Sequence, residues 1–354
     1  MRTPSHFAMP ALPSASDTQQ VGSPPGLAGV HVMTGPGTLP RNPKNRLEYL
    51  RYVQTGETPL SASELIERIP ELQQFARLSA EGGPALPYDQ PEQLKALSLK
   101  MAERLADPDI AGIVFAHGTN AIEETAYFLN LTVRSEKPIV IVGAQRPFST
   151  LSSDAPLNLL NAVRVAAAQA SRGKGTLVVL NDVIHAAREV TKSNTYRVEA
   201  FQSREIGVLG YADPDRIVYY RAPVRRHTTQ SEFNLGQIAV FPKVTILYAY
   251  SGDDDDLAKA AVAAGAKGLV IAGTGAGHAN NARKTLKELY DTAGVIVVRS
   301  ARVGAGRVIR DDNWQELGFV AADNLLPQKA RILLQLGLTR TADPQAQQRM
   351  FDEY

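Results

Sequence analysis

The sequence contains no cysteine, which excludes disulfides, thiolate catalysis and cysteine-ligated metal sites. Charge of one sign is also scarce: 38 Lys and Arg stand against 36 Asp and Glu, for a net charge of +2. That balance gives no reason to expect nucleic acid or a membrane surface as a partner. No apolar run approaches the roughly 20 residues of a membrane-spanning helix. The six histidines show no zinc-ligand spacing, so neither a metal nor a cofactor is predicted.

Residues 1–28 are rich in Pro, Ser, Gly and Gln and contain no apolar core of the length that a signal peptide needs. We expect a flexible leader there and a cytoplasmic protein. The lack of cysteine does not distinguish a cytoplasmic protein from a periplasmic one, so a periplasmic location is the alternative.

From Gly29 onward, short apolar runs alternate with amphipathic stretches, which predicts an α/β protein with a largely parallel sheet covered by helices. We expect a larger N-terminal domain at residues 29–225, a linker with a short strand at 226–242, and a smaller C-terminal α/β domain at 243–354. The expected strands are residues 110–116, 138–144, 176–180, 244–250, 268–272 and 295–299. The expected helices are residues 122–133, 156–170, 257–264, 282–292, 327–338 and 343–354.

Three local features also lead to predictions. The basic cluster at residues 225–227 is expected to be a solvated face, and Glu123 and Glu124 are expected to cap the helix that they begin. The helix at residues 156–170 is expected to bury one face, made of Leu157, Leu160, Val163 and Ala167.

Ligands of parallel sheets bind at the carboxyl ends of the strands. The strand at residues 110–116 is followed by the polar turn 117–120, which places the Thr119 hydroxyl at the sheet edge. The strand at 176–180 leads into a polar stretch that carries Lys192, which by itself would be read as a surface lysine. The glycine-rich segment 273–278 has histidine where a dinucleotide fingerprint needs its third glycine, so no nicotinamide site is predicted.

These motifs resemble those of a known family. Residues 117–129 (HGTNAIEETAYFL) resemble the second signature of bacterial L-asparaginases and glutaminase-asparaginases, and residues 142–147 (VGAQRP) look like the strand end that follows it. Residues 180–195 are similar to the segment that carries the family's lysine, and residues 325–354 resemble its C-terminal helices. The resemblance covers roughly residues 60–354.

The resemblance implies the asparaginase fold and hydrolysis of a small amide to a carboxylate and ammonia. It also implies a homotetramer, built as a dimer of dimers with each site at a dimer interface. The implied nucleophile is Thr38, within TGPGT at residues 34–38, assisted by Tyr52 from a mobile loop; Thr119 and Lys192 match the second threonine and the lysine. The implied substrate-binding positions are Asn120, Gly118, Ala144, Gln145, Ala276 and Asp311.

The departures from the family pattern fall mainly on groups that hold the substrate. Asn120 stands where the family has an aspartate that binds the α-ammonium group, and an amide supplies no charge there. The loop at residues 82–88 lacks the family's carboxylate-binding serine, Ala276 replaces an asparagine, and Asp311 is a shorter counterpart of a glutamate. Pro36 removes a backbone donor from the first threonine loop.

Three functions follow from this pattern. The first is hydrolysis of the side-chain amide of L-asparagine through a threonine nucleophile. The second is action on a different amide, a lactam or a biosynthetic intermediate. The third is a catalytically inactive homologue. Because Asn120 is uncharged, it does not stabilise the protonated form of Lys192, so Lys192 should lose its proton more easily. A neutral Lys192 can act as a base, which favours an active enzyme.

Overall fold

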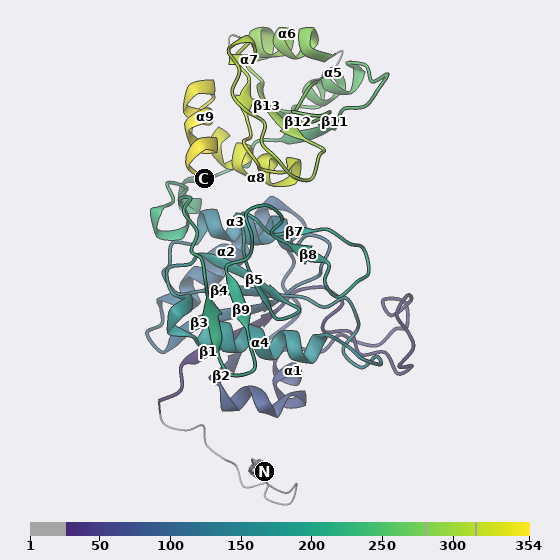
Figure 1. Ribbon diagram of the computed structural model, residues 1–354, viewed down its shortest axis with the longest axis vertical. Coiled ribbons are helices and arrows are strands. Elements are labelled where there is room, and N and C mark those ends of the chain that lie inside the picture. The colour runs from purple at the N-terminus through teal and green to yellow at the C-terminus, as the bar shows by residue number, and fades with distance from the viewer. Residues whose placement is uncertain (1–25, 280–281, 316) are drawn as a thin grey trace, which may run out of the picture.

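The computed structural model describes residues 26–279, 282–315 and 317–354, and shows two α/β units stacked along the long axis of the molecule (Figure 1). Most of the predicted leader therefore lies outside the described residues. Within the described chain, no helix is long and apolar enough to cross a membrane.

The N-terminal unit is built on an eight-stranded sheet with the order β10-β9-β6-β5-β4-β3-β1-β2. The strands from β2 to β5 in this order pair in parallel, whereas β6, β9 and β10 pair antiparallel, so the predicted α/β class with a largely parallel sheet is confirmed. The strands are β1 (Gly29–Thr34), β2 (Arg77–Ala80), β3 (Ile110–Ala116), β4 (Ile139–Val142), β5 (Thr176–Leu180), β6 (Val183–Ala186), β9 (Gly210–Ala212) and β10 (Ile217–Tyr219). A separate two-stranded ribbon pairs β7 (Thr191–Lys192) with β8 (Phe201–Gln202).

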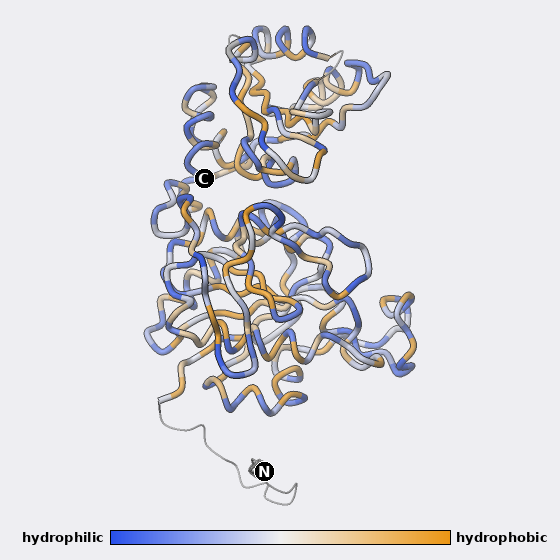
Figure 2. The backbone as a smooth tube through the Cα atoms, viewed as in Figure 1, coloured by the Kyte–Doolittle hydropathy of each residue, from blue (hydrophilic) through white to orange (hydrophobic). Residues whose placement is uncertain are grey.

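Helices cover both faces of this sheet because successive strand residues are apolar on both sides. Ile113 and Phe115 of β3 belong to the core shared with α2 and α3, whereas Val114 and Ala116 belong to the core on the opposite face, shared with α1 and α4. Figure 2 shows this as hydrophobic strands within a more polar outer layer. The helices are α1 (Ala62–Arg68), α2 (Pro91–Ala106), α3 (Ile122–Thr132) and α4 (Ala155–Ala167), with short 3₁₀ turns at Pro70–Gln74, Gln169–Ser171 and Thr228–Gln230.

The C-terminal unit has a parallel four-stranded sheet with the order β11-β12-β13-β14. Its strands are β11 (Val244–Tyr248), β12 (Gly268–Gly273), β13 (Ile296–Ala301) and β14 (Val320–Ala321). Its helices are α5 (Asp256–Ala263), α6 (Arg283–Ala293), α7 (Asp312–Gln315), α8 (Pro327–Leu338) and α9 (Pro344–Glu353). Asp343 caps α9 as predicted, because its carboxylate accepts a hydrogen bond from Ala346 N at 2.8 Å.

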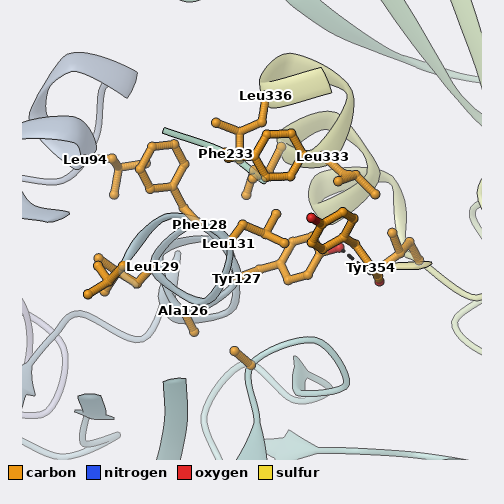
Figure 3. Packing of buried hydrophobic residues seen from close by; sticks show 14 of the residues in the cluster. Leu94, Ala126, Tyr127, Phe128, Leu129, Leu131, Phe233, Leu333, Leu336 and Tyr354 are labelled. Atoms are coloured by element: carbon orange, nitrogen blue, oxygen red, sulfur yellow. Dashed lines mark hydrogen bonds between the residues drawn. The ribbon is translucent and has the colours of Figure 1, made fainter. Parts of the chain in front are cut away.

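The two units share one hydrophobic core. Tyr127 and Phe128 of α3 pack in the same buried cluster as Leu333 of α8 and the C-terminal Tyr354 (Figure 3). The Tyr127 hydroxyl also donates to Tyr354 O at 3.4 Å. Because α3 begins directly after the Thr119 turn, this packing ties that turn to the C-terminal unit.

Two predictions about elements of the fold need correction. The short strand expected in the linker is a 3₁₀ turn at Leu235–Gln237, because the Asn234 side chain accepts from Gly236 N at 3.0 Å and bends the chain. The expected buried face of α4 is only partly confirmed: Val163 is buried and Leu160 and Ala167 pack partly buried against the core, but Leu157 is 53% exposed. The fully buried residues also include Leu159, Ala162 and Ala166, which face the sheet.

The prediction of a solvated basic cluster at residues 225–227 is also wrong. Arg225 forms an ion pair with Asp323 at 2.8 Å, and Arg226 forms one with Glu353. Both acidic partners belong to the C-terminal unit, so these arginines link the end of the N-terminal domain to the following unit.

Candidate active site

The candidate site lies at the carboxyl ends of β1 and β3. The chain passes from β1 to β2 on one side and later returns to β3 on the other, which makes the gap between β1 and β3 a topological switch point. The two turns that follow these strands touch each other, because a Cβ placed on Gly37 would lie 2.6 Å from the backbone of Gly118. Glycine at position 37 is therefore what lets the Thr38 and Thr119 turns share one site.

A cavity of about 930 Å³ opens between these turns. It is lined by seven of the ten predicted site residues, namely Thr38, Tyr52, Gly118, Thr119, Asn120, Gln145 and Lys192. Ala144 is fully buried beside it at the end of β4. Ala276 and Asp311 do not line it, because they lie in exposed loops of the C-terminal unit, after β12 and before α7.

Lys192 and Thr119 form the most direct contact in the cavity. Lys192 Nζ donates to Thr119 Oγ1 at 2.8 Å, and burial lowers the pKa of this lysine. The ribbon of β7 and β8 brings Lys192 to this point although 73 residues separate it from Thr119. A threonine hydroxyl bonded to an amine of lowered pKa is an arrangement in which the amine can take the hydroxyl proton.

Glu123 holds the Lys192 backbone in place. Its carboxylate accepts from Lys192 N at 3.4 Å and from Gln328 Nε2, on α8, at 3.0 Å.

The prediction that Glu123 and Glu124 cap α3 is wrong, since no side chain caps that helix and Glu124 pairs with Arg331 at 3.3 Å. Glu123 and Glu124 therefore contact residues of α8, and the periodicity of the sequence does not predict such contacts.

A second hydroxyl pair lies on the other side of the cavity. Thr38 Oγ1 and the Tyr52 hydroxyl are 2.9 Å apart, and either oxygen can act as the donor. The loop that carries Tyr52 is anchored nearby, because the Tyr49 hydroxyl donates to Leu151 O at 2.8 Å. Thr38 is 9% exposed and Thr119 6% exposed, so both hydroxyls are shielded from bulk water yet face the cavity.

Sequence reasoning missed Tyr88. Its hydroxyl donates to Pro36 O and accepts from Gly118 N at 3.1 Å, so it joins the two threonine turns. Its ring stacks on His117 with the centroids 3.6 Å apart. Nothing in the local pattern of the loop at residues 82–88 indicates that Tyr88 contacts positions 36 and 118.

His117 is a neutral structural residue of this turn. Burial lowers its pKa to about 3. Its Nδ1 lies 2.6 Å from Gly118 O, a contact that requires a proton on Nδ1, so Nε2 accepts from the Thr125 hydroxyl at 2.8 Å. This histidine therefore fixes the shape of the Thr119 turn and is not available as a base.

Two further charged residues line the cavity, Arg41 and Asp89. Arg41 follows Thr38 by three positions, and Asp89 lies just before α2. Neither belongs to a motif, so the sequence alone gave no signal for them.

Two threonine hydroxyls, one bonded to Lys192 and one to Tyr52, at the switch point of a parallel sheet are typical of hydrolases that use an activated hydroxyl group. Comparison with known proteins identifies the family. Residues 30–225 match the model "Asparaginase, N-terminal", and residues 243–351 match "Glutaminase/Asparaginase C-terminal domain". The chain therefore belongs to the asparaginase family, whose members hydrolyse C–N bonds.

Individual relatives agree with this assignment. The chain is 44% identical to L-asparaginase 2 of Bacillus subtilis over 83% of its own length and 79% of the relative's. It is 42% identical to a probable periplasmic L-asparaginase of Haemophilus influenzae, covering 83% of this chain and 85% of the relative. Its structure is similar to that of a probable cytoplasmic L-asparaginase from Campylobacter jejuni, with a TM-score of 0.84, 38% identity, and coverage of 92% and 100% of the two chains.

Proposed function

We propose that this chain hydrolyses the side-chain amide of L-asparagine, or of a closely related small amide, to a carboxylate and ammonia. The observation that carries the proposal is the shared cavity, in which Lys192 Nζ lies 2.8 Å from Thr119 Oγ1 while Thr38 faces the same space. The names of the relatives support asparagine as the first substrate to test.

The proposed reaction has two steps. The Thr38 hydroxyl attacks the amide carbonyl carbon, and the Tyr52 hydroxyl relays the Thr38 proton to the amide nitrogen. The C–N bond then breaks, which releases ammonia and leaves an ester on Thr38. Lys192 in its neutral form then acts through the Thr119 hydroxyl to deprotonate a water, which cleaves the ester and frees the carboxylate. Backbone N–H groups of the Thr119 turn, which borders the cavity, are suited to stabilise the oxyanion.

A second candidate substrate is favoured by Asn120. This residue lines the cavity without a charge, so it offers an α-ammonium group no ion pair. An amide with a carboxylate but without a free α-amino group is therefore the alternative substrate.

Ammonia release from L-asparagine, L-glutamine, succinamate and succinamide tests both candidates. We expect turnover of at least one of these amides, and a loss of roughly 10³-fold or more in kcat for Thr119→Val and Lys192→Met, as is typical when one member of a catalytic unit is removed. If the folded protein releases ammonia from none of these amides, the result supports a catalytically inactive homologue.

We further propose a homotetramer built as a dimer of dimers, in which Ala276 and Asp311 face the cavity of a neighbouring subunit. The position of both residues outside the cavity of their own chain supports this arrangement. The proposed domain boundaries are residues 29–225 and 243–354, joined by a linker at 226–242.

A cytoplasmic location remains our prediction. The names of the relatives include both a cytoplasmic and a periplasmic protein, so fractionation of cells that express the full chain is the direct test.

A further inference from the structure

Arg41 is a cation on the cavity wall for which the described chain provides no partner. Its guanidinium forms none of the ion pairs found within 4.0 Å, and its Nε is buried without a hydrogen-bond partner. Arginine stays charged at any pH that a folded protein tolerates, so this buried donor cannot lower its cost by losing a proton.

The backbone of Arg41 is fixed on both sides. Its N–H donates to Thr38 O at 3.0 Å, and its carbonyl accepts from Phe148 N at 2.7 Å. These bonds place the residue between the nucleophile turn and the turn that follows β4. The position of the guanidinium on the wall is therefore set by the same backbone that positions Thr38.

Gln145 adds a neutral donor from that second turn. Its backbone N–H donates to Asp154 Oδ2 at 2.9 Å, which holds the turn in place. Gln145 lines the cavity, and its side-chain Nε2 is buried with no hydrogen-bond partner in the described chain. Unsatisfied buried donors are rare in native proteins, and two on one cavity wall indicate a ligand that accepts hydrogen bonds there.

The charge of the lining indicates what that ligand is. Asp89 is the one carboxylate among the described residues that line the cavity, and the other cation, Lys192, is already bonded to Thr119. A guanidinium presents a planar fork of N–H groups that matches the two oxygens of a carboxylate. The unpartnered pair of donors therefore fits an anionic oxygen group better than a neutral one.

We propose that Arg41, assisted by Gln145, supplies the contact to the carboxylate of the substrate in this chain. The proposal rests on the amide hydrolysis proposed above, and it names Arg41 as a specificity-determining residue. It also offers this chain a carboxylate site in place of the serine that is absent from residues 82–88.

Direct binding tests the site without relying on turnover. Titration calorimetry of the full chain with succinate, and separately with L-aspartate, is compared for wild type, Arg41→Met, Arg41→Lys and Gln145→Leu. Arg146→Met is the matched control: Arg146 neighbours Gln145, does not line the cavity, and donates to Ser152 O at 2.7 Å. It removes the same charge from the same region without touching the proposed carboxylate site.

We expect Arg41→Met to weaken succinate binding by at least about tenfold, the factor for one lost charge-assisted hydrogen bond. The succinate affinity of Arg41→Lys should fall between those of Arg41→Met and wild type. The affinity of Arg146→Met should stay within about threefold of wild type, because Arg146 does not line the cavity. Gln145→Leu should weaken succinate binding less than Arg41→Met. In turnover, Arg41→Met should raise the KM of succinamate with little change in kcat, and leave succinamide unaffected.

The possible results separate the two proposals. If Arg41→Met and Arg146→Met bind succinate alike, or wild type binds neither anion, the carboxylate site is wrong even where amides are hydrolysed. If Arg41→Met alone loses succinate but no amide is turned over, the site stands and the proposed hydrolysis fails. Circular dichroism of each variant shows whether it is folded, and Arg41→Lys provides the second reading should Arg41→Met unfold.

Discussion

At the scale of single residues, Lys192 sets the pH dependence of the proposed reaction. Burial lowers its pKa from the usual 10.5, and only its neutral form accepts a proton from Thr119. We therefore expect kcat/KM to rise as pH increases through the pKa of Lys192, to level off above it, and to fall away below it. Lys192→Met should remove both the activity and this rise. A profile that is flat, or that declines across this range, would contradict the role given to Lys192.

Asn120→Asp is the companion change. A carboxylate next to Thr119 favours the charged lysine, so the midpoint of the kcat/KM profile should move to higher pH. The same carboxylate can pair with an α-ammonium group, so the KM of L-asparagine should drop relative to that of succinamate, which lacks the ammonium group. The ratio of the two KM values, measured above the midpoint, is the readout that a purely structural effect would not move.

Removal of the Tyr88 hydroxyl should lower the stability of the two threonine turns, although this hydroxyl takes no part in the proposed reaction. Tyr88→Phe leaves Gly118 N–H and the Pro36 carbonyl without their shared partner, at a cost of about 1–3 kcal/mol in the free energy of unfolding. Urea unfolding measures this loss. Tyr49→Phe, which removes a hydroxyl from an exposed contact to Leu151 O, is the control and should cost less. Equal losses in the two variants would mean that Tyr88 does not join the turns as described.

At the scale of elements, the first turn of α8 holds the active-site segment of the N-terminal unit. Lys329 is fully buried, and its Nζ donates to Ala187 O at 2.9 Å, to Arg188 O at 2.8 Å and to Val190 O. These carbonyls belong to the segment that leads into β7 and Lys192. Beside it, Gln328 donates to Glu123, which accepts from the Lys192 backbone.

Lys329→Met should therefore affect both stability and activity. It leaves buried carbonyls without donors, and we expect the free energy of unfolding to fall by about 3–5 kcal/mol, as for other broken buried networks. Gln328→Leu, one position away, should cost less stability but still lower kcat by releasing Glu123. Thermal unfolding and ammonia release measured on the same samples check both. If Lys329→Met unfolds like wild type, α8 does not hold this segment.

The same elements show what the sequence could predict. The buried strand Thr176–Leu180 and the helix Pro327–Leu338 agree with the ranges expected from periodicity and capping, because a run of apolar residues and an N-terminal proline are local signals. The face of α4 was misjudged because a helix with many apolar residues offers two plausible stripes, and only the position of the sheet selects the one around Leu159.

The residues of the candidate site that lie within sequence motifs could be predicted, and the others could not. The position of Thr119 after a predicted strand indicates this residue directly, whereas Lys192, Thr38 and Tyr52 are predicted only through the family resemblance. Arg41, Tyr88 and Gln328 are not predicted, because their roles arise from contacts between segments that are distant along the chain. The Tyr88 hydroxyl, for example, meets Pro36 across 52 positions, and no local pattern encodes such a contact.

At the scale of the whole molecule, a shared hydrophobic core holds the two units together. α3 contributes Tyr127 and Phe128, and the C-terminal unit contributes Leu333 and Tyr354, to one buried cluster (Figure 3). The ion pairs of Arg225 and Arg226 add links at the chain connection. The exposed loops with Ala276 and Asp311 are thereby held away from their own cavity, as the proposed contact with a neighbouring chain requires.

Subunit mixing tests that arrangement. Light scattering should give a mass four times the 38.3 kDa of one chain. Asp311→Ala and Thr119→Val should each lower activity when pure. In a two-fold dimer made of one chain of each kind, one site combines an intact Thr119 with an intact Asp311 from the partner, while the other site carries both changes. Refolding an equal mixture should therefore restore roughly a quarter of the wild-type activity. If the mixture shows only the average of the two pure variants, Asp311 acts within its own chain or not at all, and the sites do not lie between subunits.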